Sequence, residues 1–312
     1  MTTEPPPTGK TRAFALPPQL RTMSDDQLLE LRDLVRKKAW VKAASISGPS
    51  DRHAAQITKL RREGRDKEAR AVEKRLYLDA HWESLRWFLF GGHVDLPVPT
   101  DPTRAWDATS NPWLKIRVPG WATTLDEHDQ ANPYKPLPDK QYLRLLAYAW
   151  VMEPLLAIPK SRQMMVTWLF CAIAAHDLVA RDAQRAAFIS KKFDDANALL
   201  GRINTIISKL PGEYNDMLPP RTTHKIGHLE APEHNCHVHA MGEEAKGLRS
   251  YTFSWVFFDE SAFADQASEI MRAGMPTVKG GGRFTLVSTS NGEEPFFRVI
   301  SDSGQIPVPA GV

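Results

Sequence analysis

Residues 254–261 read Ser254-Trp255-Val256-Phe257-Phe258-Asp259-Glu260-Ser261, an apolar run that ends in two adjacent carboxylates, and this stretch decides the fold class. A short, continuous apolar run is typical of a strand that is buried on both faces of a parallel sheet. Neighbours along a strand point apart, so the two carboxylates would take different roles. Asp259 can hold Mg²⁺ while Glu260 polarises an attacking water. The simpler alternative is an acidic pair that caps a helix after a core strand.

Similar strands recur on either side of this stretch. We expect strands at Leu155–Ile158, Ala186–Ile189 and Phe284–Val287, with helices over 167–181 and 194–210 between them. This alternation predicts an α/β fold in which a mainly parallel sheet is flanked by helices. Ligands of such sheets bind at the carboxyl ends of the strands, so the polar segments there are the candidate site.

The first polar segment spans residues 160–167 and reads Lys-Ser-Arg-Gln-Met-Met-Val-Thr, between a strand and a helix. A loop that enters a helix N-terminus aims free backbone N–H groups at a phosphate. Aligned with the P-loop pattern GxxxxGK[ST] on Thr167, Lys160 and Met165 replace the two glycines and Val166 replaces the lysine. The strict motif fails, but two cations and a hydroxyl for Mg²⁺ remain. The alternative is an ordinary loop with two surface cations.

The second polar segment is the Asp259-Glu260 pair at the end of the opening stretch. The third, Ser288-Thr289-Ser290-Asn291, follows the strand at Phe284–Val287. Its hydroxyl and amide groups could sense a γ-phosphate by hydrogen bonding, although a plain turn would look the same. The order of the three segments is more specific than any one of them. The carboxylate-ended strand follows the phosphate segment after about ninety residues, and the hydroxyl-ended strand follows about thirty residues later.

The whole set resembles the ATPase domain of large terminase subunits, the motors that package tailed-phage DNA. Lys160-Ser161-Arg162-Gln163 with Thr167 is similar to the family's deviant phosphate loop, in which a lysine stands at the loop's start. Phe257-Phe258-Asp259-Glu260 looks like its Walker B strand with the catalytic glutamate, and Ser288-Thr289-Ser290 looks like its coupling motif. Gly247-Leu248-Arg249 is similar to a small-Arg-Gly segment, and residues 132–141 to the upstream glutamine element that reads adenine.

The resemblance implies a P-loop (RecA/ASCE-like) fold and the hydrolysis of ATP with Mg²⁺ to package double-stranded DNA into a procapsid. It implies catalytic roles for Glu260, Lys160 and Arg162, and Mg²⁺ ligation by Thr167 and Asp259. Nucleotide binding falls to Gln141, Lys160, Ser161, Arg162, Gln163, Met164, Met165, Val166 and Thr167. Coupling to DNA movement falls to Ser288, Thr289, Ser290 and Asn291. An arginine finger from a neighbouring subunit is also implied, with Arg249 and Arg202 as candidates.

The implied partners are double-stranded DNA, the portal protein, the small terminase subunit and further copies of the chain in a ring. The implied location is the host cytoplasm of an infected bacterium, outside the mature virion and without a membrane. One departure is Met165, which stands where the family has glycine, so its side chain could crowd the β-phosphate and slow or abolish turnover.

Three domains are expected: a flexible Pro-rich leader (1–20), a basic helical extension (21–95) and the P-loop ATPase domain (96–312), with the family's nuclease domain absent. Residues 1–90 carry 18 Lys and Arg against 12 Asp and Glu, which hints at a polyanionic partner. A capping box at Ser24–Gln27 starts the extension. Residues 51–90 form either two antiparallel helices turning at residues 63–65 or one kinked helix.

Composition excludes several protein classes. With 42% hydrophobic and 25% charged residues, the chain is neither disordered nor collagenous. The longest uncharged apolar run, Val166–Ala175, is about half of what a membrane span needs. Cys171 and Cys236 form no CxxC pair, and we expect them to be reduced thiols. Five histidines and Cys236 cluster within residues 224–239, where alternation favours a polar-faced strand over a zinc site.

Two other functions remain open at this point. A helicase-like DNA-dependent ATPase would share the Asp-Glu strand and the Ser-Thr-Ser segment, but it needs a second core domain for which few residues remain. A non-hydrolysing module that binds nucleotide or DNA is favoured by Met165 and Val166 in the phosphate loop. Glu260 argues against that module, because a protein that only binds has no use for a carboxylate that activates water.

Overall fold

The computed structural model of the chain describes residues 51–97, 113–118, 120–210, 222–243, 246–249, 251–289 and 291. The predicted leader, the helix expected from Ser24 and the coupling residue Ser290 lie outside the described residues. Strands β1 (Gly92–Pro97) and β2 (Trp113–Val118) pair with each other and belong to a separate compact unit. All that follows concerns the unit formed by residues 42–92 and 119–312.

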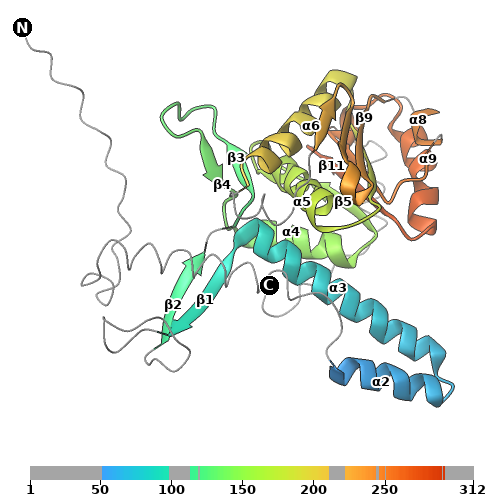
Figure 1. The fold of residues 1–312 in the computed structure, drawn as a ribbon. Coiled ribbons are helices and arrows are strands. Elements are labelled where there is room, and N and C mark those ends of the chain that lie inside the picture. Colours follow the sequence, from blue (N-terminus) through green and yellow to red (C-terminus); the bar gives the residue numbers. More distant parts are fainter. Residues whose placement is uncertain are drawn as a thin grey trace, which may run out of the picture. The chain divides into compact units, whose positions relative to one another are not determined.

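A seven-stranded sheet forms the centre of this unit, in the order β5-β11-β10-β6-β9-β8-β7 (Figure 1). The first five strands of that order run parallel, and β8 and β7 are added antiparallel at one edge. The strands are β5 (Leu155–Pro159), β6 (Arg185–Ile189), β7 (Thr223–Lys225), β8 (His228–Ala231), β9 (Cys236–Met241), β10 (Trp255–Asp259) and β11 (Arg283–Ser288). The predicted α/β fold with a mainly parallel sheet is confirmed.

Helices cover both faces of the sheet. The connections from β5 to β6 and from β6 to β9 run one way across the sheet, and the connection from β10 to β11 runs the other way. Because such crossovers are right-handed, α5 (Val166–Ala180) and α6 (Phe193–Ser208) lie on one face and α9 (Ala267–Lys279) on the opposite face (Figure 1). The short helix α8 (Lys246–Arg249) packs against α9.

Helix α5 is apolar on all sides because it lies between the sheet and other helices. Twelve of its fifteen residues are buried, and it contacts α3 (Asp66–Phe90), α4 (Gln141–Met152) and α6. The apolar run that the sequence places at Val166–Ala175 is therefore core helix. Among the described residues, no helix combines the length and the apolar character needed to cross a membrane.

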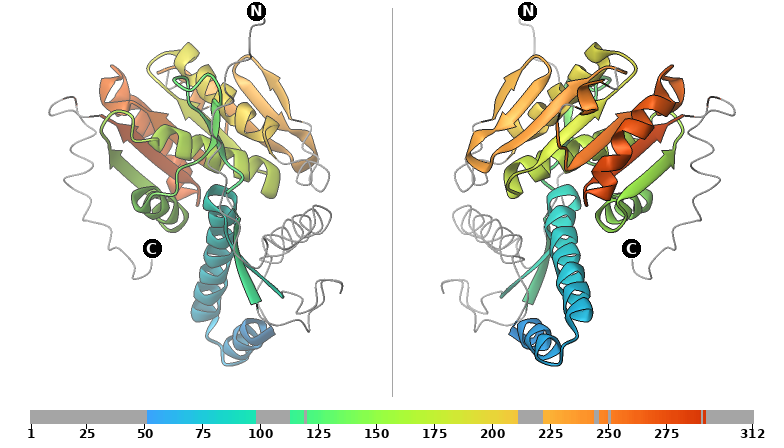
Figure 2. Two further views of the ribbon diagram at one scale, coloured as in Figure 1. Left: turned by 90° about the vertical axis from the view of Figure 1, so that its left-hand side faces the viewer. Right: turned by 90° about the vertical axis from the view of Figure 1, so that its right-hand side faces the viewer.

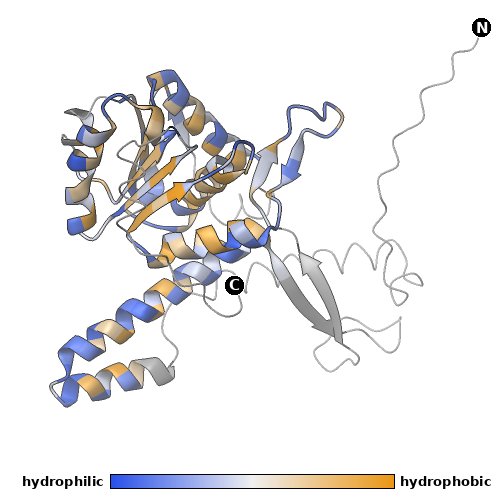
Figure 3. Ribbon diagram, turned by 180° about the vertical axis from the view of Figure 1, so that it is seen from behind, coloured by the Kyte–Doolittle hydropathy of each residue, from blue (hydrophilic) through white to orange (hydrophobic). Residues whose placement is uncertain are grey.

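Residues 51–90 form two helices, α2 (Asp51–Arg62) and α3 (Asp66–Phe90), which pack on each other. Gly64 turns the chain between them with a φ of 72°, a value that suits a residue without a Cβ. Figure 3 shows α2 and the first half of α3 as mostly hydrophilic. A small core of Ile57, Leu60 and Ala69 joins the two helices. The structure thus selects the two-helix alternative.

The second half of α3 is part of the core around the sheet. Its last six residues include the buried Leu85, Trp87 and Phe88, and the helix packs on α4 and α5 (Figure 2). The second half of α3 thus belongs to the same compact unit as the sheet. An antiparallel hairpin, β3 (Thr123–Leu125) and β4 (Tyr134–Pro136), precedes α4 in the chain.

Candidate active site

Three strand ends meet at the carboxyl edge of the sheet. In the register, Ser288 of β11 pairs with Pro159 of β5, and Asp259 of β10 pairs with Val287. The backbone N–H of Lys160 donates to the carbonyl of Ser288 at 2.9 Å. This bond ties residues 160–165, called the phosphate loop after their predicted role, to the end of β11. The three polar segments of the sequence, about 130 residues apart at their extremes, therefore lie side by side.

The phosphate loop ends in a backbone conformation that favours glycine. Met165 has φ 56° and ψ 9°, in the left-handed region, and it caps the start of α5. Gln163 also has a positive φ, of 62°. A left-handed conformation costs a residue with a Cβ about 1–2 kcal/mol. The loop thus keeps the backbone turn at the position where a P-loop has its second glycine, although the residue is methionine.

Thr167 and Asp259 bring hard oxygen atoms together. The hydroxyl of Thr167, in the first turn of α5, lies 3.1 Å from Oδ2 and 3.3 Å from Oδ1 of Asp259. Adjacent ligands around octahedral Mg²⁺, with bonds of about 2.0–2.1 Å, lie about 3 Å apart. Burial raises the pKa of Asp259 above its usual range, against the opposing effects of Lys160 and Thr167. This oxygen pair fits Mg²⁺, whose charge would favour the ionised carboxylate.

Glu260 is held by groups from the other two segments. Lys160 Nζ donates to its Oε1 at 2.6 Å, while the backbone N–H and the hydroxyl of Thr289 both donate to Oε2 at 3.2 Å. Burial works to raise the pKa of Glu260, but the bonds from Lys160 and Thr289 outweigh it and lower the pKa. The carboxylate is therefore ionised at neutral pH. Its backbone is left-handed, with φ 49°, a conformation that is uncommon for a residue with a Cβ.

Ser288 and Asn291 brace the loop that follows Glu260. Ser288 Oγ accepts a hydrogen bond from the backbone N–H of Ala262 at 3.1 Å and lies 3.4 Å from Glu260 Oε2. The side-chain amide of Asn291 donates to the carbonyl of Ala262 at 3.0 Å. The predicted coupling residues that the structure describes are thus bonded to the glutamate or to the turn next to it.

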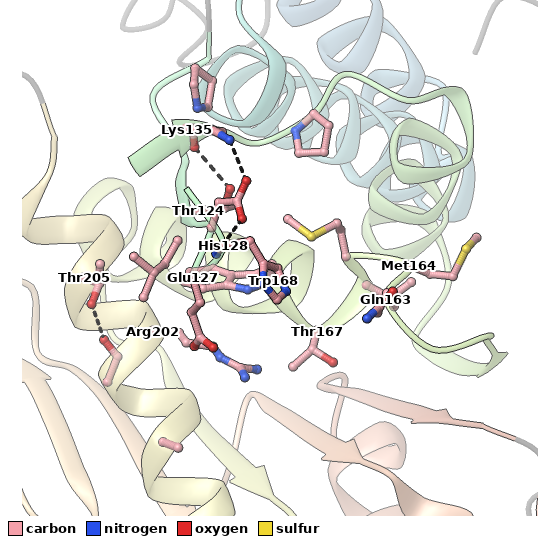
Figure 4. Close-up of a pocket in the computed structure, with 18 of the residues that line it drawn as sticks. Thr124, Glu127, His128, Lys135, Gln163, Met164, Thr167, Trp168, Arg202 and Thr205 are labelled. Carbon is pink, nitrogen blue, oxygen red and sulfur yellow. Dashed lines mark hydrogen bonds and ion pairs between the residues drawn. The ribbon is translucent and has the colours of Figure 1, made fainter. Parts of the chain in front are cut away.

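A cavity of about 940 Å³ opens beside the phosphate loop (Figure 4). It is lined by the loop and start of α5, by α6, and by the segment that carries the β3–β4 hairpin. Its volume is within the usual range for small-molecule sites. Figure 4 shows Glu127 and Arg202 on one side of Thr167, and the guanidinium of Arg202 lies 5.4 Å from the ring of Trp168. The cavity is therefore large enough for a small-molecule ligand beside the loop.

The predicted nucleotide-binding residues divide into two groups. Lys160 and all residues from Gln163 to Thr167 line the cavity. Ser161 and Arg162 are exposed on the loop, and Gln141 is exposed at the start of α4, so these three lie outside the lining. The neighbour of Gln141, Tyr142, donates its hydroxyl to the carbonyl of Met164 at 3.1 Å.

The two candidate arginine fingers occupy different places. Arg202 lines the cavity of its own chain. Arg249 is the last residue of α8, on the side of the sheet that carries α9.

Sequence reasoning missed Glu127, His128, Lys135 and Trp168 as cavity residues. The first three belong to the β3–β4 segment, whose strands have only three residues each. Runs this short carry no readable alternation. Trp168 directly follows Thr167, so a check of the side chains next to the helix start could have found it.

No family model and no curated protein sequence matches the chain. Among solved structures, it is similar to the large terminase ATPase domain of Thermus phage P74-26, with 18% identity and a TM-score of 0.38, over 52% of this chain and 73% of that one. It is similar to the large terminase of bacteriophage HK97, with 13% identity and a TM-score of 0.45, over 57% of this chain and 39% of that one. A third is the large terminase of a thermophilic bacteriophage in complex with ADP, with 11% identity and a TM-score of 0.31, over 43% and 33%.

Proposed function

We propose that the chain is the ATPase motor domain of a phage large terminase, which hydrolyses ATP with Mg²⁺ to move double-stranded DNA into a procapsid. One observation carries the proposal. Thr167 contacts Asp259, and Lys160 contacts Glu260, at a strand edge next to a nucleotide-sized cavity. These four side chains are what phosphoryl transfer to water requires: a phosphate cation, an oxygen pair for the metal and a base.

Each residue has a role that follows from its surroundings. Lys160 would neutralise phosphate charge, and Thr167 with Asp259 would hold Mg²⁺, which when bound offsets the negative charge on the phosphoryl oxygens. Glu260 is ionised, so it can orient water and accept its proton. The free N–H groups at the start of α5 add a positive partial charge toward the phosphates.

The contact between Lys160 and Glu260 suggests how binding leads to hydrolysis. A phosphate that enters the loop competes for the ammonium of Lys160, which now lies 2.6 Å from Glu260. When Lys160 turns to the phosphate, Glu260 is left with Thr289 and is free to bind water. Thr289 would then sense the change, which fits a role for Ser288–Asn291 in coupling hydrolysis to DNA movement.

The partners follow from the proposal. A packaging motor would act in the host cytoplasm as a ring of copies, with the portal protein and the small terminase subunit. Its contacts with double-stranded DNA would be mostly to phosphates, so DNA binding should weaken as salt rises. A helicase-like ATPase could use the same four side chains.

A module that binds nucleotide without hydrolysing it is the second candidate. The strained Met165 favours it, because the side chain lies where a P-loop has only backbone. The ionised Glu260 favours the ATPase instead, since its hydrogen bonds fix the carboxylate in the form that can orient a water.

Phosphate release from Mg²⁺-ATP, with and without linear duplex DNA, tests the proposal on the intact chain and on Glu260→Gln. General-base catalysis contributes about 10²–10⁴-fold, so we expect a loss of that size in the variant. Glu233→Gln is the matched control, because Glu233 is exposed and lies outside the cavity lining. Nucleotide binding, measured by thermal shift, should survive in both variants.

Intact binding with no turnover at any protein concentration would support the binding module. Turnover that is unchanged in Glu260→Gln would contradict the assignment of the base. Turnover that rises with DNA or with protein concentration would support a motor that acts with its neighbours.

A further inference from the structure

The solvent-facing side of the antiparallel pair β8–β9 gathers four polar side chains. In the register, Glu230 pairs with His237 and His228 pairs with His239. Burial alternates along both strands, so these four lie on one face while Leu229, Ala231, Cys236, Val238 and Ala240 are buried on the other. The polar-faced strand that the sequence favours is confirmed. The pairing, however, brings together residues that the sequence keeps apart.

Three of these side chains already have the spacing of metal ligands. His228 Nε2 lies 3.3 Å from His237 Nδ1, and Glu230 Oε2 lies 3.9 Å from that same Nδ1. One ligand atom from each residue falls within 4.8 Å of the other two. In a tetrahedral zinc site with Zn–N bonds of about 2.0–2.1 Å, neighbouring ligand atoms are about 3.4 Å apart. The two imidazoles meet this spacing, and Oε2 of Glu230 lies 3.9 Å from Nδ1 of each ring.

A neighbouring residue presents His237 to the cluster. Asn235 Oδ1 lies 3.2 Å from His237 Nε2, so it can accept the N–H there and leave the lone pair on Nδ1, which faces His228 and Glu230. Metal-bound histidines characteristically donate their second nitrogen in this way.

Glu230 divides its two oxygens between different partners. Lys225 Nζ lies 4.0 Å from Oε1, while Oε2 is the oxygen that faces the two histidines. The carboxylate can therefore bind an ion through Oε2 without giving up Lys225. The positive charge of Arg185 stands near His237 and opposes a cation, so the ligand set has to supply strong bonds.

We propose that His228, Glu230 and His237 form a zinc site on the solvent face of β8–β9, separate from the nucleotide cavity. Two imidazoles and one carboxylate select zinc over magnesium, whose preferred ligands are oxygens. The three side chains are 26%, 23% and 19% exposed, so the fourth position is open to water or to a ligand from outside. A bound ion would join β8, which lies next to the edge strand β7, to β9 and stabilise this end of the sheet.

The test uses the full chain without a histidine tag, after treatment with a chelator. Zn²⁺ is titrated calorimetrically, and Co²⁺ is used as a visible-absorption probe of tetrahedral geometry. We expect one ion per chain, an increase in the melting temperature with Zn²⁺, and no such increase with Mg²⁺ at the same concentration. His237→Asn and Glu230→Gln should each weaken zinc binding more than about 100-fold, beyond the 10–100-fold typical of residues that only support a ligand.

Two further variants show whether binding depends on this geometry. Asn235→Gly removes the side chain that orients His237 and tolerates the left-handed backbone of φ 50°, so we expect a loss of about 10–100-fold. His224→Asn is the matched control, because His224 lies on the same hairpin, is exposed, and pairs with Leu229 on the opposite face. It should bind zinc as the unmodified chain does.

Melting curves without metal would show whether each variant is folded, and Glu230→Gln changes neither shape nor size appreciably. The proposal is overturned if the unmodified chain binds no zinc. It is equally overturned if folded Glu230→Gln and His237→Asn bind zinc undiminished, or if His224→Asn loses as much as they do.

Discussion

Replacing Met165 by glycine should relieve a backbone strain that the phosphate loop carries. Met165 has φ 56° and ψ 9°, which costs a residue with a Cβ about 1–2 kcal/mol. Glycine adopts this conformation freely, but it also gains about 0.5–1 kcal/mol of conformational freedom in the unfolded chain. The backbone contribution of Met165→Gly is therefore stabilising by about 0.5–1 kcal/mol.

Met164→Gly is the matched control, since it removes a methionine side chain from the position directly before Met165. Met164 does not have a positive φ, so glycine there brings only the cost in the unfolded chain, about 0.5–1 kcal/mol. Both side chains line the cavity and are at least partly exposed, so the loss of packing is similar in the two variants. We expect Met165→Gly to be more stable than Met164→Gly by about 1–2 kcal/mol.

Urea unfolding at pH 7, followed by circular dichroism, measures this difference. Nucleotide binding by thermal shift adds a functional readout, because Met165 stands where a phosphate would approach the loop, and its removal should tighten ATP binding. Equal stability of the two variants would refute the argument from backbone strain. Weaker ATP binding by Met165→Gly would refute the argument that the side chain crowds the phosphate.

Two further predictions follow from buried or paired charges. His81 has a pKa lowered by burial from 6.5 to about 4; Asp177 Oδ1 lies 3.4 Å from its Nε2, but neither ring nitrogen has a hydrogen-bond partner. The unfolded chain therefore binds one more proton than the folded chain as the pH falls from 6.5 toward 4. The free energy of unfolding should drop by about 2 kcal/mol between pH 7 and pH 5. Urea unfolding of His81→Phe should not show this drop. Lys160→Met removes the cation beside Glu260, and calorimetry should show ATP binding weakened about 10–100-fold, whereas unchanged affinity would exclude Lys160 from phosphate binding.

The sequence predicted those strands and helices whose pattern lies within a single short segment. The apolar runs that end at Pro159, Asp259 and Ser288 could be recognised because buried parallel strands are continuous and short. Their carboxyl ends had to lie at one edge of the sheet, so the fold class placed Lys160 and Glu260 at the same edge. The strand order that brings the two side chains into contact came from the structure. The helices after β5 and β6 were recognisable for the same reason. Helix α9 was missed, because Pro276 and several small residues blur its pattern.

Tertiary structure decided the features that depend on contacts between distant segments. The β3–β4 hairpin lines the cavity with Glu127 and His128, which no local pattern marks as functional. The strain at Met165 is held by the loop's bonds to its neighbours, and it runs against the residue's own preference.

By itself, the sequence determined the strands and the chemistry at their ends, because burial and alternation are encoded in neighbouring residues. Only the tertiary structure decided which loops close the cavity, and that His237 faces His228 and Glu230. Strand pairing depends on register across a hairpin, and a slip of one residue would send every side chain to the other face.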